Sequence, residues 1–366
     1  MRFALLALAA AALAHAESPD TPPAAGDLRA WKQPAVSEIK LDNGFTIDSI
    51  EDNSLPLVNV TLLFSGGIRR DPLDHPGLAA SVADGLGLGT PIQPASRIVE
   101  NLSRAAATMS IDAGPDSIAI QGGATPDALP LLIAVIADLV REANFPRAAL
   151  ELSAQGHRQA LLRQASQAGY AANEVLFSAL FGDHPYSKVA PSPIGPITDS
   201  SVLLAYRNAY LTPANGTLVL AGKLPQRAVL QKLLTERFGS WTGAAPPSEL
   251  AAKVPVPARH LLLIDRPGLP VSEIRIGKVA PSQADDRYFA ALVALELVNS
   301  RWQGKFPRGA RIELQSLAEA SPLIASAQCM LADTGQTLAR LADGLDSLAT
   351  SPLNAAELAA AKTAAN

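Results

Sequence analysis

The sequence predicts an α+β fold made of two homologous domains, in each of which helices pack against an antiparallel sheet. Two observations lead to this prediction. Short apolar or alternating segments typical of strands are separated by longer amphipathic segments typical of helices. The same order of elements starts again after a proline-rich stretch, residues 243–258. The chain has 366 residues, 48% of them hydrophobic, which is enough for two packed cores.

The first residues of the chain are predicted to be a targeting sequence. Arg2 is followed by an apolar run from Phe3 to Leu13 and by a small-x-small cleavage site that ends at Ala16. A membrane anchor is the alternative, but spanning a bilayer takes about 20 apolar residues. We therefore expect residues 1–16 to be a signal peptide, cleaved after Ala16. The mature chain is then periplasmic or secreted, and no later stretch is expected to span a membrane.

The remaining chain divides into four predicted parts. Residues 17–35 begin with a proline- and alanine-rich stretch and are expected to be a disordered leader. Residues 36–242 are expected to form the first domain, and residues 243–258 a linker without periodicity. Residues 259–366 are expected to form the second domain.

The first domain opens with a predicted hairpin over residues 39–47. Its Asn43-Gly44 turn favours type I′ geometry. Asp74 or His75 is expected to cap a helix whose first turn holds Pro76. The alternation or helical periodicity of the other segments predicts strands at 57–64, 118–124 and 217–221 and helices at 76–88, 126–142, 148–164 and 224–238.

The second domain repeats this order. Its predicted strands are 261–265, 271–277 and 323–331, and its predicted helices are 285–299 and 334–348. Residues 55–58 (LPLV) and 269–272 (LPVS) open corresponding strands, and Phe145 and Leu150 correspond to Leu353 and Leu358, 208 residues later in both cases. A duplication is the simplest account, and two unrelated domains of similar element order are the alternative.

The repeat also predicts that the second domain is incomplete. At an offset of 208 residues, nothing in the chain corresponds to residues 159–241. A sheet that lacks those elements keeps an unpaired edge and an uncovered core. We expect either that the chain is truncated or that a partner completes this domain.

Charge and cysteine content argue against nucleic-acid binding and against disulfides. The net charge is −4 and no basic stripe is present, so nucleic acid is not an expected partner. Cys329 is the single cysteine, which rules out an internal disulfide. It lies in an apolar run and is predicted to be a buried small hydrophobe.

Several short motifs occur in an order that resembles the pitrilysin, insulinase and mitochondrial processing peptidase family of zinc metallopeptidases. The resemblance is ordered over residues 36–241 and weaker from residue 260 onward. The motifs are residues 43–45 (NGF), 66–72 (GGIRRDP), 77–79 (GLA), 89–90 (GT), 184–186 (HPY), 210–215 (YLTPAN) and 218–222 (LVLAG). The resemblance implies a clam-shell half made of two α+β domains.

Active members of that family carry His-x-x-Glu-His on the helix after the Gly-Leu-Ala motif, with two histidines for zinc and a glutamate that activates water. In this chain the two histidine positions hold Ala80 and Asp84, and the glutamate position holds Ala83. The helix expected to carry the third ligand, residues 155–164, has no carboxylate. The resemblance therefore implies an inactive homologue that binds no zinc and needs no other cofactor.

Two further sets of residues are candidates for a site. His75, Asp84 and His157 would form a rebuilt metal site if the fold brought them together. The simpler interpretation of His75 is a solvent-exposed residue that caps the start of a helix. The resemblance also implies an arginine and a tyrosine from the second domain that hold the substrate backbone. Arg308 or Arg311 is the candidate arginine for substrate binding, but no tyrosine follows Tyr288.

The expected function is that of a noncatalytic subunit. Such a chain would pair with an active zinc peptidase of the same family and contribute wall and peptide contacts to the closed chamber. A stand-alone peptide-binding or scaffold protein is one alternative, and a truncated copy without function is the other.

Overall fold

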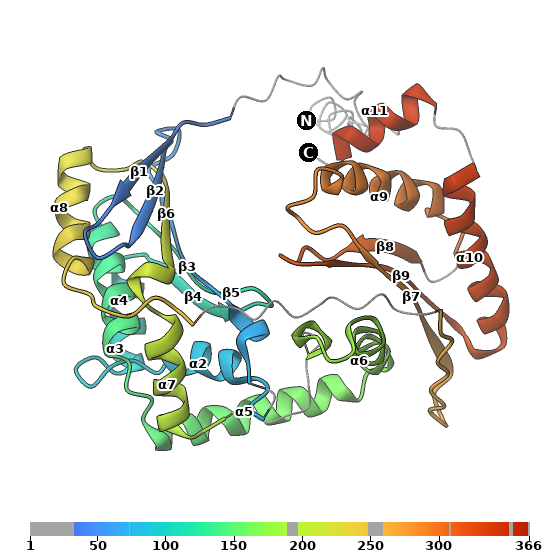
Figure 1. Ribbon diagram of the computed structural model, residues 1–366, viewed down its shortest axis with the longest axis horizontal. Coiled ribbons are helices and arrows are strands. Elements are labelled where there is room, and N and C mark those ends of the chain that lie inside the picture. The colour runs from blue at the N-terminus through green and yellow to red at the C-terminus, as the bar shows by residue number, and fades with distance from the viewer. Residues whose placement is uncertain are drawn as a thin grey trace, which may run out of the picture. The chain divides into compact units, whose positions relative to one another are not determined.

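The structure is a computed structural model that describes residues 33–72, 74–188, 197–247, 259–306, 309–350 and 354–364 (Figure 1). The predicted signal peptide, residues 17–32 of the predicted leader and residues 248–258 of the predicted linker lie outside these ranges. From Pro34 onward the chain forms one compact unit. That unit contains two sheets, so the predicted α+β class is confirmed.

The first sheet has six strands in the order β1-β2-β6-β3-β5-β4. Neighbouring strands are antiparallel except β2 and β6, which run parallel. The strands are β1 (Val36–Lys40), β2 (Thr46–Glu51), β3 (Val58–Ser65), β4 (Thr108–Ala113), β5 (Ser117–Ala124) and β6 (Gly216–Gly222).

Helices of the first half pack mainly on one face of this sheet. Alternate residues of β3, from Val58 to Phe64, are buried in the same cluster as the apolar stripe of the helix Leu129–Glu142. The helices of this half are α2 (Leu78–Leu86), α3 (Ala95–Arg104), α4 (Leu129–Glu142), α5 (Arg147–Ala165), α6 (Ala168–Phe181), α7 (Ser200–Tyr210) and α8 (Arg227–Phe238). Three short 3-10 turns also belong to this half: η1 (Gly67–Arg70) between β3 and α2, η2 (Pro185–Lys188) between α6 and α7, and η3 (Pro213–Asn215) between α7 and β6.

The predicted hairpin forms between β1 and β2, but its predicted type I′ turn is wrong. A type I′ turn needs a positive φ at both central residues, and only Gly44 has one here, with φ 87°. The Gly44 N–H donates to the Leu41 carbonyl, so Asp42 and Asn43 are the central residues. The Asn43 amide donates to the carbonyls of Phe238 and Trp241 instead, which holds the hairpin against the end of α8.

The second sheet has three antiparallel strands in the order β7-β9-β8. They are β7 (Val271–Ala280), β8 (Ala310–Leu314) and β9 (Ser321–Met330). Helices α9 (Tyr288–Trp302) and α10 (Thr334–Thr350) share a buried cluster with one face of the sheet, and α11 (Ala355–Ala364) packs on α9. Cys329 is buried in that cluster, as predicted. The predicted strand at residues 261–265 is wrong, because these residues pair with no strand.

The two halves share one order of elements. In the first half β3, α2, β4, β5, α4 and α5 occur in this order, with α3 as an additional helix between α2 and β4. In the second half β7, α9, β8, β9, α10 and α11 occur in the same order. The strand order is also the same, β3-β5-β4 in one sheet and β7-β9-β8 in the other. Such agreement is what a duplication produces. In the described part of the chain, β1, β2 and β6 have no strand counterpart in the second sheet.

Candidate functional site

Helix α2, which would carry the zinc ligands of an active relative, is capped from outside the helix. Its N-cap residue, Gly77, has a left-handed conformation and makes no side-chain cap bond. The Asp71 carboxylate accepts the N–H groups of Gly77 and Ala79 at 2.7 and 2.8 Å. Asp71 therefore performs the capping that we predicted for Asp74 or His75. Burial raises the pKa of Asp71 to about 6, and its bonds from Ala79 and Gly77 oppose that rise.

Ala80, Ala83 and Asp84, the positions that the resemblance assigns to the zinc ligands and the base, differ in what surrounds them. Ala83 is 3% exposed and belongs to the core, so it presents no group to solvent. Ala80 is partly exposed and lies one helical turn before Asp84. Only Asp84 of the three carries a polar side chain.

Asp84 is joined to His157, which lies on α5. The His157 Nδ1 is 2.8 Å from the Asp84 Oδ2, and the two side chains are 45% and 35% exposed. Burial raises the pKa of Asp84; the charge of His157 and its hydrogen bond lower it, and the charge of Asp112 on β4 raises it. The structure thus brings together two members of the predicted His75, Asp84 and His157 group. His75 instead lies 3.1 Å from Asp74, Nδ1 to Oδ1.

The residues at this place do not fit a catalytic zinc ion. Such an ion needs three protein ligands and an open position, with a base to activate its water. Here the side chains of Ala80 and Ala83 are methyl groups, and Asp84 is bound to His157. In the described ranges no group of three or more His, Cys, Asp or Glu side chains is placed to hold a metal.

Strand β4 borders the same place and is an edge strand. It pairs with β5 on one side and contacts α2. Thr108, Ser110 and Asp112 are exposed along it, while Met109 and Ile111 pack toward the core. An edge strand presents unpaired backbone N–H and C=O groups to which an extended peptide can add.

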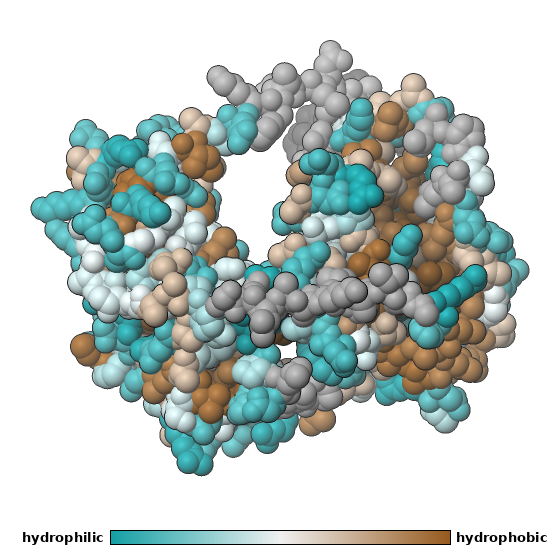
Figure 2. Space-filling model, in the orientation of Figure 1, coloured by the Kyte–Doolittle hydropathy of each residue, from teal (hydrophilic) through white to brown (hydrophobic). Residues whose placement is uncertain are grey.

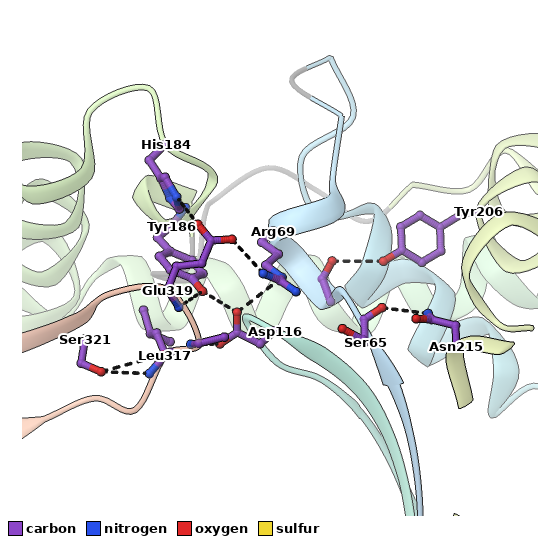
Figure 3. Close-up of polar contacts among 12 residues, drawn as sticks. Ser65, Arg69, Asp116, His184, Tyr186, Tyr206, Asn215, Leu317, Glu319 and Ser321 are labelled. Carbon is purple, nitrogen blue, oxygen red and sulfur yellow. Dashed lines mark hydrogen bonds and ion pairs between the residues drawn. The ribbon is translucent and has the colours of Figure 1, made fainter. Parts of the chain in front are cut away.

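A second group of polar side chains joins distant segments of the chain (Figure 3). We call it the polar cluster; it consists of Arg69 from η1, Asp116 from the β4–β5 turn, His184 and Tyr186 at η2, and Glu319 from the loop before β9. The Tyr186 hydroxyl donates to the Asp116 Oδ1 at 2.5 Å, and the other Asp116 oxygen accepts the Ala318 N–H at 2.9 Å. Arg69 Nη1 lies 2.8 Å from Glu319 Oε1 and its Nε lies 3.5 Å from Asp116 Oδ1.

Both ring nitrogens of His184 have a partner in this cluster. Its Nδ1 accepts the Tyr186 N–H at 3.2 Å, so the proton is on Nε2, which lies 3.0 Å from Glu319 Oε2. The side chain is 2% exposed. Burial raises the pKa of the Tyr186 phenol. These largely buried groups bind the first-half segments to the loop before β9, which is a structural role.

The two arginines predicted to bind substrate are placed differently. Arg308 lies outside the described residues. Arg311 lies on β8, is 69% exposed and forms an ion pair with Glu313, Nη2 to Oε2, at 3.2 Å. Arg311 is therefore accessible. The tyrosine that the resemblance implies beside it has no candidate after β8, because no tyrosine follows Tyr288 in the sequence.

Sequence reasoning missed two members of the polar cluster. Nothing local distinguishes Asp116 or Glu319, because the hydrogen bonds to Tyr186 and Arg69 join residues 70 and 250 positions apart. The His-Pro-Tyr motif lies at the start of the 3-10 turn η2, which places His184 and Tyr186 in the cluster. Arg69 was noted only as part of the motif at residues 66–72.

Comparison with protein-family models finds a match in the C-terminal part of the chain. Residues 199–365 match the family model described as the peptidase M16 inactive domain. No curated protein sequence matches the chain. Within the described ranges no helix has the length and apolarity needed to cross a membrane.

Solved structures share the fold at low sequence identity. A peptidase M16 inactive domain from Pseudomonas fluorescens has a TM-score of 0.77 at 18% identity, over 90% of this chain and 82% of that one. A protease from Helicobacter pylori has a TM-score of 0.70 at 15% identity, over 90% and 84%. The periplasmic protease PqqL from Escherichia coli has a TM-score of 0.68 at 16% identity, over 92% of this chain and 40% of PqqL.

Residues 199–365 are similar to the peptidase M16 inactive domain, and the described chain has the fold of the solved M16 structures. Because a structure described as a protease shares the fold, the fold alone does not decide whether a chain is catalytic. The family model that matches residues 199–365 is described as inactive, which supports a noncatalytic chain.

Proposed function

We propose that the chain is the noncatalytic subunit of a peptidase, paired with an active zinc-binding member of the same family in the periplasm. The observation that carries this proposal is the Asp84–His157 pair, which takes the place of a metal site while the surrounding strands and helices stay intact. A truncated homologue without function would not need an ion pair between α2 and α5. PqqL, a structural neighbour, is a periplasmic protease, which supports the compartment.

The chain would contribute peptide contacts rather than chemistry. The β4 edge next to Asp84 offers backbone groups for an extended peptide. Arg311, and Arg308 beside it in sequence, would bind a peptide carbonyl or carboxylate from the second half. A stand-alone peptide-binding protein is the second candidate, because an edge strand binds peptide without any partner chain.

The pairing is tested by purifying the tagged chain from its native host and by assaying peptide cleavage. We expect a stoichiometric His-x-x-Glu-His homologue in the eluate, and cleavage that rises when the two chains are mixed. The Arg311→Ala variant should raise KM of the mixture several-fold. Arg104→Ala is the matched control, since Arg104 is also exposed and ion-paired. Peptide binding by the isolated chain, with no family partner in the eluate, would favour the stand-alone alternative.

Partial repair of the site provides a separate prediction. In Ala80→His/Asp84→His, the two new imidazoles and His157 offer three ligands, so we expect the variant to bind zinc more tightly than the natural chain. We expect no peptide hydrolysis, because Ala83 still leaves the water without a base. Metal titration and a quenched-fluorescence peptide assay measure both. Hydrolysis by this double variant, without Ala83→Glu, would show that the ligand positions are misassigned.

A further inference from the structure

The sequence contains two Asn-Gly pairs, and the fold brings them to the same end of the first sheet. They are residues 43–44, in the turn between β1 and β2, and residues 215–216, where η3 leads into β6. Thr46 of β2 pairs with Thr217 of β6, so both pairs precede the same point of the parallel ladder. In an unfolded chain an Asn-Gly pair is prone to deamidation, because glycine has no side chain to keep its backbone nitrogen from reaching the asparagine side chain.

The first pair is fixed by four hydrogen bonds. The Asn43 Nδ2 donates to the two carbonyls at the end of α8 at 2.7 and 2.9 Å, which uses both protons of the side-chain amide. The Asn43 Oδ1 accepts the Phe45 N–H at 3.2 Å, and the Gly44 N–H donates to the Leu41 carbonyl at 2.9 Å. The two groups that would have to react, the Gly44 nitrogen and the Asn43 amide, are therefore each held by other partners.

The second pair is fixed in the same way. The Asn215 Nδ2 donates to the Ser65 carbonyl at 2.9 Å (Figure 3) and to the Tyr210 carbonyl at 2.7 Å. The Gly216 N–H donates to the Pro213 carbonyl. Because Ser65 ends β3 and Tyr210 ends α7, one side-chain amide joins the ends of both elements to the start of β6.

Both glycines are required by the fold, although they make the pairs reactive. Gly44 has φ 87°, which a residue with a side chain adopts only with strain. A Cβ atom at Gly216 would lie 2.9 Å from the ring of Phe45 and 3.1 Å from the ring of Phe64. A larger residue after either asparagine would slow deamidation but would also disturb this end of the sheet.

Hydrogen bonds, and not burial, protect the two asparagines. Asn43 and Asn215 are both partly exposed. Around the first of them, Figure 2 shows mostly hydrophilic to neutral surface where Figure 1 places α8 and the hairpin of β1 and β2. Water, which takes part in the reaction, therefore has access, and the fixed geometry of the amide is what prevents the attack.

We infer that Asn43 and Asn215 are modification sites that open only when the chain unfolds, and that their modification destabilises the native fold. In the unfolded chain the glycine nitrogen gives its proton to solvent base and attacks the asparagine Cγ. The new C–N bond forms, and the side-chain nitrogen leaves as ammonia after taking up a proton. Water then opens the resulting succinimide ring at one of its two C–N bonds, which leaves aspartate or isoaspartate.

Either product is incompatible with the bonds that the amide makes. A carboxylate at position 43 or 215 has no proton to donate, so its oxygen would face the two carbonyl oxygens that Nδ2 now serves. Isoaspartate also lengthens the main chain by one carbon where β2 or β6 begins. Temporary unfolding therefore leaves a permanent loss of stability. This inference concerns the first sheet and does not depend on the pairing with a peptidase.

The test incubates the chain, residues 17–366, in buffer and in urea at the same temperature and mildly alkaline pH. Peptide mapping by mass spectrometry measures deamidation at each asparagine. We expect deamidation of Asn43 and Asn215 to be at least about tenfold slower in the folded chain, since it requires an opened state. Asn53 is the internal control, because Asn53 and the Ser54 N–H bind exposed carboxylates instead of main-chain carbonyls. Its rates in buffer and in urea should be similar.

Aspartate variants test the effect of the product separately. Asn43→Asp and Asn215→Asp should each lower the urea midpoint of unfolding, and Asn53→Asp should leave it unchanged. If either of the first two variants does not fold, the destabilisation is confirmed, and the rates in the natural chain still test the protection. Equal rates for Asn43 and Asn215 in buffer and in urea would overturn the inference. An unchanged urea midpoint in both aspartate variants would also overturn it.

Discussion

Replacing Arg69 by methionine is expected to lower the free energy of unfolding by about 3 kcal/mol, the loss typical of a broken buried ion pair. Arg69 is the cation of the polar cluster, with a side chain only 12% exposed. It faces Asp116 and Glu319, which are 24% and 27% exposed. Methionine keeps much of the apolar stem, so the variant removes charge more than volume. It leaves two carboxylates close together without a cation between them.

The matched control for this prediction is Arg104→Met. Arg104 also binds a carboxylate, Glu100, at 2.6 Å, but its side chain is 73% exposed. An exposed pair contributes at most about 1 kcal/mol. Urea unfolding of both variants measures the difference. Adding Asp116→Asn to the Arg69→Met chain should recover part of the loss, and equal losses in the two methionine variants would contradict the role given to the cluster.

Replacing Phe181 by alanine is expected to cost about 3–4 kcal/mol. Phe181 ends α6 and is 0% exposed. Its ring lies 5.9, 5.9 and 5.5 Å from the rings of Phe177, His184 and Tyr186. The same cluster includes Ile324 of β9, so the cavity would open where α6 packs on the second sheet.

Phe289→Ala is the control for Phe181→Ala, because Phe289 is 71% exposed on α9. That change should stay within about 0.5 kcal/mol. Hydrogen exchange adds a local measurement. The amides of α6 and β9 should exchange faster in the Phe181 variant, and their exchange rates should be unchanged in the control. A uniform loss of protection over the first sheet, with β9 unaffected, would show that the cluster does not join these parts.

The elements with full burial on one face were predictable from the sequence. Val58, Val60, Leu62 and Phe64 alternate in β3, and α4 carries a continuous apolar stripe. Strand β4 was missed because its alternate residues are only partly buried, so its alternation is weak. Helix α3 was missed because it buries only Ile98 and Leu102. The opposite error at residues 261–265 has a physical reason: a strand needs a neighbour, and sequence patterns do not show whether one is present.

The candidate site was predictable only in part. The positions of Ala80, Ala83 and Asp84 follow from the motif order, and the loss of zinc ligands follows from their chemistry. The Asp84–His157 pair needs α2 and α5 to lie side by side, which no local pattern specifies. The polar cluster depends on even longer separations, since Arg69 and Glu319 are 250 residues apart.

Metal content and peptide cleavage of the purified chain, residues 17–366, test the central claim most directly. We expect less than about 0.1 zinc per chain by elemental analysis after equilibration with excess zinc, because a catalytic site needs three protein ligands and Ala80 offers none. We also expect no cleavage of an unstructured peptide beyond a no-protein blank. Stoichiometric zinc together with cleavage that a chelator abolishes would contradict the conclusion that this chain is noncatalytic.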